Sequence, residues 1–183
     1  MRYIHNDRQS TGFVLPLLAL RTQDKPCGEF PDLEKLAALA KKWDMNLIQI
    51  LPVNDSGWQA SPYSALSSIA LNPIYLSIKD LPEFKQLSPA LRGSLAQMNA
   101  QFALHKRVPY GEVLGAKLKI LSEAWKEISS PSAPDRTGVL SALEGWVKKN
   151  EWVRPYGCFL ELKKRFGGLP WWNWPEYATV RQD

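Results

Sequence analysis

Residues 47–58, Leu47-Ile48-Gln49-Ile50-Leu51-Pro52-Val53-Asn54-Asp55-Ser56-Gly57-Trp58, indicate the fold of this chain most directly. The apolar run before Pro52 is typical of a buried strand, and the proline ends it because proline cannot donate a ladder hydrogen bond. A polar loop with an aromatic residue follows. Loops at the carboxyl ends of parallel strands carry the ligand sites of α/β proteins. The stretch therefore predicts a strand that leads into a binding loop.

A second short buried strand is expected upstream, over residues 12–15 and closed by Pro16. Between the two strands, Pro31 and Asp32 open a predicted helix, with the carboxylate at its positive end. Its apolar face consists of Leu33, Leu36, Ala37, Ala40 and Trp43. Strand, helix and strand over about 40 residues make a right-handed crossover between parallel strands the natural topology. Both following loops then open on one rim.

From residue 83 onward, the sequence carries helical periodicity. Ser88-Pro89 is typical of a helix start. The expected buried positions are Leu91, Leu95, Met98 and Phe102, then Val113, Leu114, Leu118, Leu121, Trp125 and Ile128. Later apolar positions predict one long or two abutting helices, ended by Gly167-Gly168: Leu140, Leu143, Trp146, Val147, Tyr156, Phe159, Leu160 and Phe166. We accordingly expect a first βαβ portion over residues 1–82 and a mostly helical subdomain over 83–183.

The composition is that of a globular domain, because 45% of the 183 residues are hydrophobic and 22% are charged. The formal net charge of +5 does not indicate nucleic-acid binding, since no known nucleic-acid motif accompanies it. The basic clusters instead fall where cations complement helix C-termini: Lys41-Lys42, Lys148-Lys149 and Lys163-Lys164-Arg165. The partners expected from charge therefore do not include nucleic acid.

Cysteine and histidine usage argues against a zinc site, because Cys27 and Cys158 lie far apart and His5 and His105 are equally scattered. Two separated cysteines fit reduced thiols in a cytoplasm. The charged start, residues 1–9, does not look like a signal peptide, and no apolar run approaches the length of a membrane span. We expect a cytoplasmic protein without a membrane partner.

The loop after Leu51 has two of the three ingredients of a sugar site. Asn54 and Asp55 can hydrogen-bond to hydroxyls, and Trp58 and Tyr63 provide rings for the apolar side of a pyranose. The third ingredient, a pair of carboxylates about 5 Å apart, is needed for retaining transfer. Structural roles are alternatives: a strand-end turn at Asn54-Asp55 that satisfies its own backbone, and a core position for Tyr63.

Several motifs resemble those of the 4-α-glucanotransferases, also called amylomaltases or disproportionating enzymes. They are Leu-Pro-x-Asn-Asp at 51–55, Gly-Glu-Phe-Pro-Asp-Leu at 28–33, Ser-Pro-Tyr at 61–63, Asn-Pro-Ile-Tyr-Leu at 72–76 and Trp-Trp-Asn-Trp-Pro at 171–175. The resemblance implies a TIM (β/α)8 barrel. This chain would form its N-terminal part with an inserted helical subdomain, so the barrel would be incomplete.

The same resemblance implies roles for individual residues. Tyr63 would be a sugar platform beside the cleavage point with Ser61 close by, and Trp58 would be at most an outer-subsite contact. Asn72 and Pro73 would have structural roles. The substrate implied is an α-1,4-glucan or maltooligosaccharide, transferred between chains with retention, and no metal or organic cofactor is implied.

No catalytic residue is expected within this chain. The family's nucleophilic aspartate, acid/base glutamate and second aspartate lie beyond the residues given, and none of Asp24, Glu29, Asp32 or Asp55 matches them. Asp55 is the single carboxylate of the rim loop, and one carboxylate cannot both attack and protonate. We expect the chain alone to be inactive and to associate with residues that complete the barrel. The alternative is an inactive stand-alone module that binds glucan or dimerises.

Overall fold

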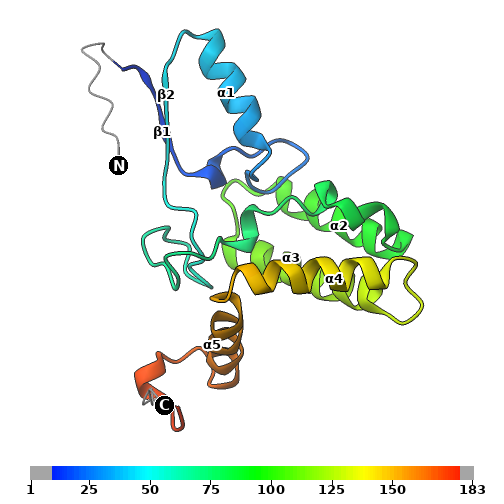
Figure 1. Ribbon diagram of the computed structural model, residues 1–183. Helices are drawn as coiled ribbons and strands as arrows, with labels where there is room; N and C mark the ends of the chain where they lie inside the picture. Colours follow the sequence, from blue (N-terminus) through cyan, green and yellow to red (C-terminus); the bar gives the residue numbers. More distant parts are fainter. Residues whose placement is uncertain (1–9, 178–183) are drawn as a thin grey trace. The chain divides into compact units, whose positions relative to one another are not determined.

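The computed structural model describes residues 10–177 (Figure 1). The charged start at residues 1–9, on which the signal-peptide argument rested, lies outside the described residues. The chain divides into two compact units, Met1–Ile128 and Ser129–Asp183. The expected division at residues 82/83 follows a change from strands to helices rather than compactness, and it stays a prediction.

The predicted βαβ element is confirmed at the start of the first unit. Strands β1 (Gly12–Leu15) and β2 (Leu47–Ile50) form a two-stranded parallel sheet, with Phe13 opposite Ile48. Helix α1 (Asp32–Lys42) connects them and lies beside the strands (Figure 1). Because the strands are parallel, the chain leaves both of them at the same edge of the sheet.

Helix α1 follows the predicted pattern at its ends and departs from it on its face. Asp32 occupies its first turn and Lys41-Lys42 its last, as the helix dipole favours. Leu36 and Ala40 are buried and Leu33 is half-buried, but the expectation that Ala37 and Trp43 are buried is wrong, because both are exposed. Trp43 comes directly after the helix, and its exposed ring lies 5.8 Å from that of Phe13 between centroids.

The expectation that both strands are buried is also wrong. Val14 is 65% exposed and Leu47 is 45% exposed, whereas Phe13 and Ile48 on the opposite face are half-buried. Alternate residues of a strand point to opposite faces. Since α1 packs beside only one face of this small sheet, the other face stays open in the described residues.

The core of the first unit lies away from the sheet. It gathers short 3-10 turns and two long helices, α2 (Pro89–Ala103) and α3 (Tyr110–Ser129). The turns are Leu17–Ala19, Pro73–Tyr75, Ile78–Asp80 and Pro82–Gln86. Their fully enclosed side chains include Leu17, Ile74, Ile78 and Val113. The loop after β2 is therefore anchored on a helical core.

Helix α2 matches its prediction, and all four expected positions are buried. Its cap is also as expected, because the Ser88 hydroxyl accepts a hydrogen bond from the Leu91 N–H at 3.2 Å. The Ser88 N–H and hydroxyl donate to the Glu127 carboxylate of α3, at 2.8 and 2.7 Å, and these bonds lower the pKa of Glu127. The cap thus ties α2 to α3.

The predicted face of α3 is partly wrong. Val113 and Leu114 are buried as expected, but Leu118 and Trp125 are exposed. Lys117, Ile120 and Ala124 take the buried positions instead. The face turned inward thus includes a lysine, whose hydrogen-bond acceptors lie in other segments of the chain.

The sequence left open whether one long helix or two abutting helices form this region. The described part of the second unit has two α-helices, α4 (Arg136–Lys149) and α5 (Val153–Arg165). Gly167 and Gly168 follow α5 with φ of +64° and +81°, as a helix-ending glycine pair should. Neither helix contains a fully buried residue. The unit is held instead by neighbouring rings: Trp146, Trp152, Tyr156, Phe159, Phe166 and Trp174.

The tryptophan motif at 171–175 is divided between packing and surface. Trp174 is buried, and its indole N–H donates to the Leu169 carbonyl at 3.0 Å. Trp171 and Trp172 of the 3-10 turn Trp171–Asn173 are exposed, with centroids 5.7 Å apart. Of the three tryptophans in this motif, Trp174 alone is therefore buried.

Candidate functional site

The loop that follows β2, residues 52–71, is closed by backbone pairing at its base. Asn54 forms an antiparallel bridge with Leu71, and the Asp55 N–H donates to the Ala70 carbonyl at 2.8 Å. The Asn72 N–H donates to the Val53 carbonyl at 2.9 Å. These contacts fix both ends of the loop, so the residues between them project from a defined base.

Within loop 52–71, Ser56 closes a tight turn over residues 56–59. Its carbonyl accepts from the Gln59 N–H at 3.1 Å, and its hydroxyl donates to the Gln59 carbonyl at 2.7 Å. Gly57 adopts a left-handed φ of +56°, which glycine tolerates without steric cost. Trp58 lies at the tip of the turn with 64% of its surface exposed. The indole of Trp58 is therefore accessible to solvent, and the backbone of the turn that carries it is constrained.

A buried polar network holds this turn to the start of α3. The Tyr110 hydroxyl donates to the Gly57 carbonyl at 2.8 Å and accepts from the Asn72 side-chain amide at 2.7 Å. The same amide donates to the Ser56 hydroxyl at 3.2 Å. The other end of the Asn72 side chain accepts from the Ile74 N–H at 3.0 Å. The structural role expected of Asn72 agrees with these contacts.

Asp55 is turned inward rather than toward the surface. Its carboxylate accepts from the Gly57 N–H at 2.8 Å, which makes the local turn that Asp commonly forms. The residue is buried, and its carbonyl also accepts from the Leu66 N–H at 2.7 Å. The turn-forming alternative for Asp55 is thus present in the structure. Asn54 is half-buried at the base of the loop.

Ser61 and Tyr63 lie further along the same loop, at its surface. Tyr63 is 73% exposed, so the reading of this residue as a core tyrosine is wrong. The Tyr63 N–H donates to the Ser61 hydroxyl at 3.4 Å, a long hydrogen bond. Loop 52–71 therefore presents two exposed rings, from Trp58 and Tyr63, with the hydroxyl of Ser61 between them in sequence.

A buried ionic cluster joins the segment before α1, the first turn of α1, and α3. It consists of Lys25, Glu29, Asp32 and Lys117, all with less than a tenth of their surface exposed. Lys117 Nζ donates to Glu29 Oε1 at 2.7 Å and to the Ile74 and Leu76 carbonyls at 2.6 and 2.9 Å. All three ammonium hydrogens thus have acceptors.

Lys25 completes this cluster by bridging the two carboxylates. Its Nζ lies 2.6 Å from Asp32 Oδ2 and 3.4 Å from Glu29 Oε2. Burial alone would raise the pKa of Asp32, but hydrogen bonds from Lys25 and the Glu29 N–H outweigh it and lower the pKa. Burial likewise opposes the charge of Lys25, yet Asp32 and Glu29 raise its pKa. Asp32 and Lys25 therefore stabilise each other's charge, which suits a structural role better than acid–base work.

Cys27 lies beside this cluster and is enclosed. Burial, as the main cause, raises the pKa of its thiol to about 11, and its sulfur lies 3.8 Å from the Ile74 carbonyl oxygen. Such a thiol is a poor nucleophile at neutral pH. Cys158 is a free thiol at the surface. Over residues 10–177, His, Cys, Asp and Glu do not gather in threes as metal ligands would.

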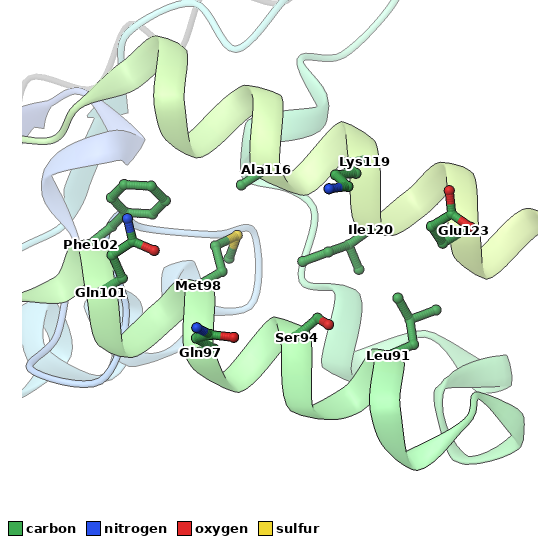
Figure 2. A pocket seen from close by; sticks show the side chains of 10 residues that line it. All are labelled: Leu91, Ser94, Gln97, Met98, Gln101, Phe102, Ala116, Lys119, Ile120 and Glu123. Carbon is green, nitrogen blue, oxygen red and sulfur yellow. The ribbon is translucent and has the colours of Figure 1, made fainter.

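A groove of about 330 Å³ runs between α2 and α3 (Figure 2). Apolar side chains of both helices line it, among them Met98, Phe102 and Ile120, with Lys119 and Glu123 on the α3 side. Its lining includes no residue of loop 52–71.

None of the described helices is both long and apolar enough to cross a bilayer.

Sequence reasoning missed the residues that hold loop 52–71 in place. Tyr110 and Lys117 both lie on α3, and their contacts reach 53 and 88 residues back along the chain. A signal did exist for Lys117, because it occupies the position in the apolar spacing between Val113 and Ile120. Tyr110 fits the same spacing, three residues before Val113, whereas Ser56 has no comparable signal.

Comparison with known proteins identifies the family to which the sequence is similar. The sequence profile of the family described as 4-alpha-glucanotransferase matches residues 15–183. A 4-alpha-glucanotransferase of Chlamydia caviae is 36% identical over 92% of this chain and 31% of its own length. One from Thermus thermophilus is 31% identical over 74% of this chain and 25% of its own length.

A solved structure of similar fold is the amylomaltase from Corynebacterium glutamicum, with a TM-score of 0.58 and 27% identity. The similarity covers 72% of this chain and 20% of that one. The chain therefore spans about a third or less of the length of these relatives. Because the family profile covers nearly all of the sequence, the chain belongs to the 4-alpha-glucanotransferase family.

Proposed function

We propose that this chain is the N-terminal part of a 4-α-glucanotransferase and provides sugar-binding loops to a TIM barrel that further residues complete. The observation that carries the proposal is the family match over residues 15–183. It is supported by the parallel β1–β2 pair with one open face, as expected of strands that take part in a larger sheet. The free thiols of Cys27 and Cys158 are consistent with a cytoplasmic location, which is part of the proposal.

In the proposed reaction, an α-1,4-glucan segment is transferred with retention. A carboxylate attacks the anomeric carbon, and the glycosidic oxygen leaves with a proton from an acid. The 4-hydroxyl of an acceptor sugar then displaces the carboxylate and gives its proton to the conjugate base of that acid. Residues outside this chain would provide those carboxylates. Trp58 and Tyr63 would contact sugar rings, and Ser61 and Asn54 would contact hydroxyls.

The carboxylates of this chain are consistent with catalytic carboxylates that come from residues outside it. Glu29 and Asp32 lie together, but both are buried and bonded to lysines. Asp55 is engaged in its own turn through the Gly57 N–H. A retaining mechanism needs one carboxylate free to attack and a second able to deliver a proton. We therefore infer that the chain alone does not transfer glucan.

The test is disproportionation of maltotriose by the chain alone and by a fusion of residues 1–183 to the remaining part of the Chlamydia caviae relative. The fusion should release glucose and make longer maltodextrins, while the chain alone should do neither. Activity of the chain alone that disappears in Asp55→Asn would contradict the proposed division. An inactive but folded fusion would contradict the proposed function.

A second candidate function is a stand-alone module that binds glucan or assembles without catalysis. The exposed apolar residues Val14 and Leu47 on the open face of the sheet favour association with some partner, either the rest of a barrel or a second copy. Under this alternative the chain would dimerise by itself, and the fusion would gain no activity.

A further inference from the structure

We propose that Tyr110 is a positioning residue that fixes the turn at residues 56–59, so that Trp58 is a preformed platform for a glucose ring. The ligand named here, a maltooligosaccharide, rests on the proposed function. The positioning itself rests on the contacts of Tyr110 and can be tested without any ligand.

The hydroxyl of Tyr110 is placed where it controls the backbone next to Trp58. It donates to the Gly57 carbonyl, whose peptide bond leads directly into Trp58, and it accepts from Asn72. Asn72 in turn donates to Ser56 at the start of the turn. Tyr110 and Asn72 are both buried, so the hydrogen bonds that Asn72 donates to Tyr110 and Ser56 are shielded from water. One hydroxyl thus connects both halves of the turn to the core.

Helix α3 also supports the ring of Trp58 itself. A β-carbon on Gly115 would lie 3.5 Å from Cη2 and 3.6 Å from Cζ3 of the indole, so the end of the six-membered ring rests against the helix. The rest of the side chain stays open, with 64% of its surface exposed. Tyr110 and Gly115 therefore hold the backbone and the ring of Trp58 from the same helix.

Tyr63 provides an internal contrast. It is more exposed than Trp58, and its backbone contact with the Ser61 hydroxyl is long, at 3.4 Å. A side chain that is ordered before binding loses less conformational freedom on contact with a ligand. Within this chain, Trp58 is accordingly the ring best prepared to receive a sugar, and Tyr110 is the residue that prepares it.

The experiment uses the whole 183-residue chain and its Tyr110→Phe variant, which keeps the ring and removes the hydroxyl. Trp58→Phe identifies the Trp58 indole signal among the eight tryptophans in 1H–15N spectra. The matched control is Ser88→Ala, because Ser88 bonds to Leu91 and Glu127 and not to the turn. Measurements are the heteronuclear NOE of the Trp58 indole, thermal melting, and the dissociation constant for maltoheptaose.

Tyr110→Phe should lower the indole NOE of Trp58 and weaken maltoheptaose binding about threefold or more. Ser88→Ala should lower the melting temperature and leave both readouts unchanged. If Tyr110→Phe lowers only the melting temperature, its role is structural and the inference is wrong. If the NOE falls as expected but neither wild type nor variant binds maltoheptaose, positioning stands and glucan binding by this chain fails.

Discussion

Lys117 Nζ lies 2.7 Å from Glu29 Oε1 although 88 residues separate the two in the chain, and the lysine side chain is fully enclosed. Glu29 belongs to the segment just before α1, and the lysine also binds the Ile74 and Leu76 carbonyls after loop 52–71. One ammonium group therefore joins the segment before α1, the segment after loop 52–71 and α3. A buried charge of this kind is tolerated only when its hydrogen bonds are satisfied.

Lys117→Ala should destabilise the chain strongly, because it removes one of the two lysines of Glu29 and the ammonium donor of the Ile74 and Leu76 carbonyls. Loss of one partner of a buried ion pair costs about 3–5 kcal/mol. The measurement is the free energy of unfolding in urea. Lys119→Ala, two positions along α3 on its exposed side, is the control and should change stability little. Equal effects of the two substitutions would show that the cluster does not stabilise the fold.

The sequence was informative wherever a contact is local. Residues 12–15, 32–42 and 47–50 form the predicted elements, because proline punctuation and apolar spacing act within a few residues. The Ser88 cap of α2 was likewise readable from its neighbour Pro89. These features decide the order of elements but not which of their faces becomes buried.

Contacts between distant segments explain what could not be predicted. The α3 face includes Lys117 because its acceptors come from residues 29, 74 and 76. Val14 is exposed because burial of a strand depends on what covers its two faces, which the strand sequence does not encode. The reach of Tyr110 to Gly57 follows the same rule, whereas the contact of the Asp55 carboxylate with the Gly57 N–H is local and was one of the two readings of the sequence.

The free energy of unfolding should fall at low pH and at high pH, because Asp32 and Lys25 of the buried ionic cluster each lose their charge there. The pKa of Asp32 is lowered by folding, so its contribution is present above the unfolded value of 3.8 and is lost as pH falls below it. The pKa of Lys25 is raised, so its contribution is complete below 10.5 and is lost as pH rises above that value.

The measurement for this pH dependence is urea unfolding from pH 2.5 to 11, compared with Asp32→Asn. The substitution should lower the free energy of unfolding near neutrality. It should also make that free energy depend less on pH at acid pH (the acid limb), since the titrating carboxylate is absent. Glu127 also has a lowered pKa, so Glu127→Gln should flatten part of the same limb. An acid limb that is unchanged in Asp32→Asn would contradict the role assigned to this carboxylate.

Tyr63→Ala, made in the active fusion described above, should reduce kcat/KM for maltotriose about tenfold or more. This loss corresponds to about 1.4 kcal/mol, the size expected when one ring no longer positions the reacting sugar. Because Tyr63 is 73% exposed, its removal should leave the melting temperature nearly unchanged. Tyr177→Ala is a control at another exposed tyrosine outside loop 52–71. An unchanged kcat/KM would remove Tyr63 from the proposed site.

The isolated chain should self-associate as its concentration rises, because the open face of the β1–β2 sheet presents Val14 and Leu47 to solvent. Sedimentation velocity over a wide concentration range measures this association. Val14→Lys should weaken it by placing a charge on the open face, whereas Gln86→Lys, which adds the same charge at an exposed position outside the sheet, is the matched control. If the wild-type chain stays monomeric throughout and melts cooperatively, the exposed face is tolerated without a partner, and the argument that these strands need further cover is wrong.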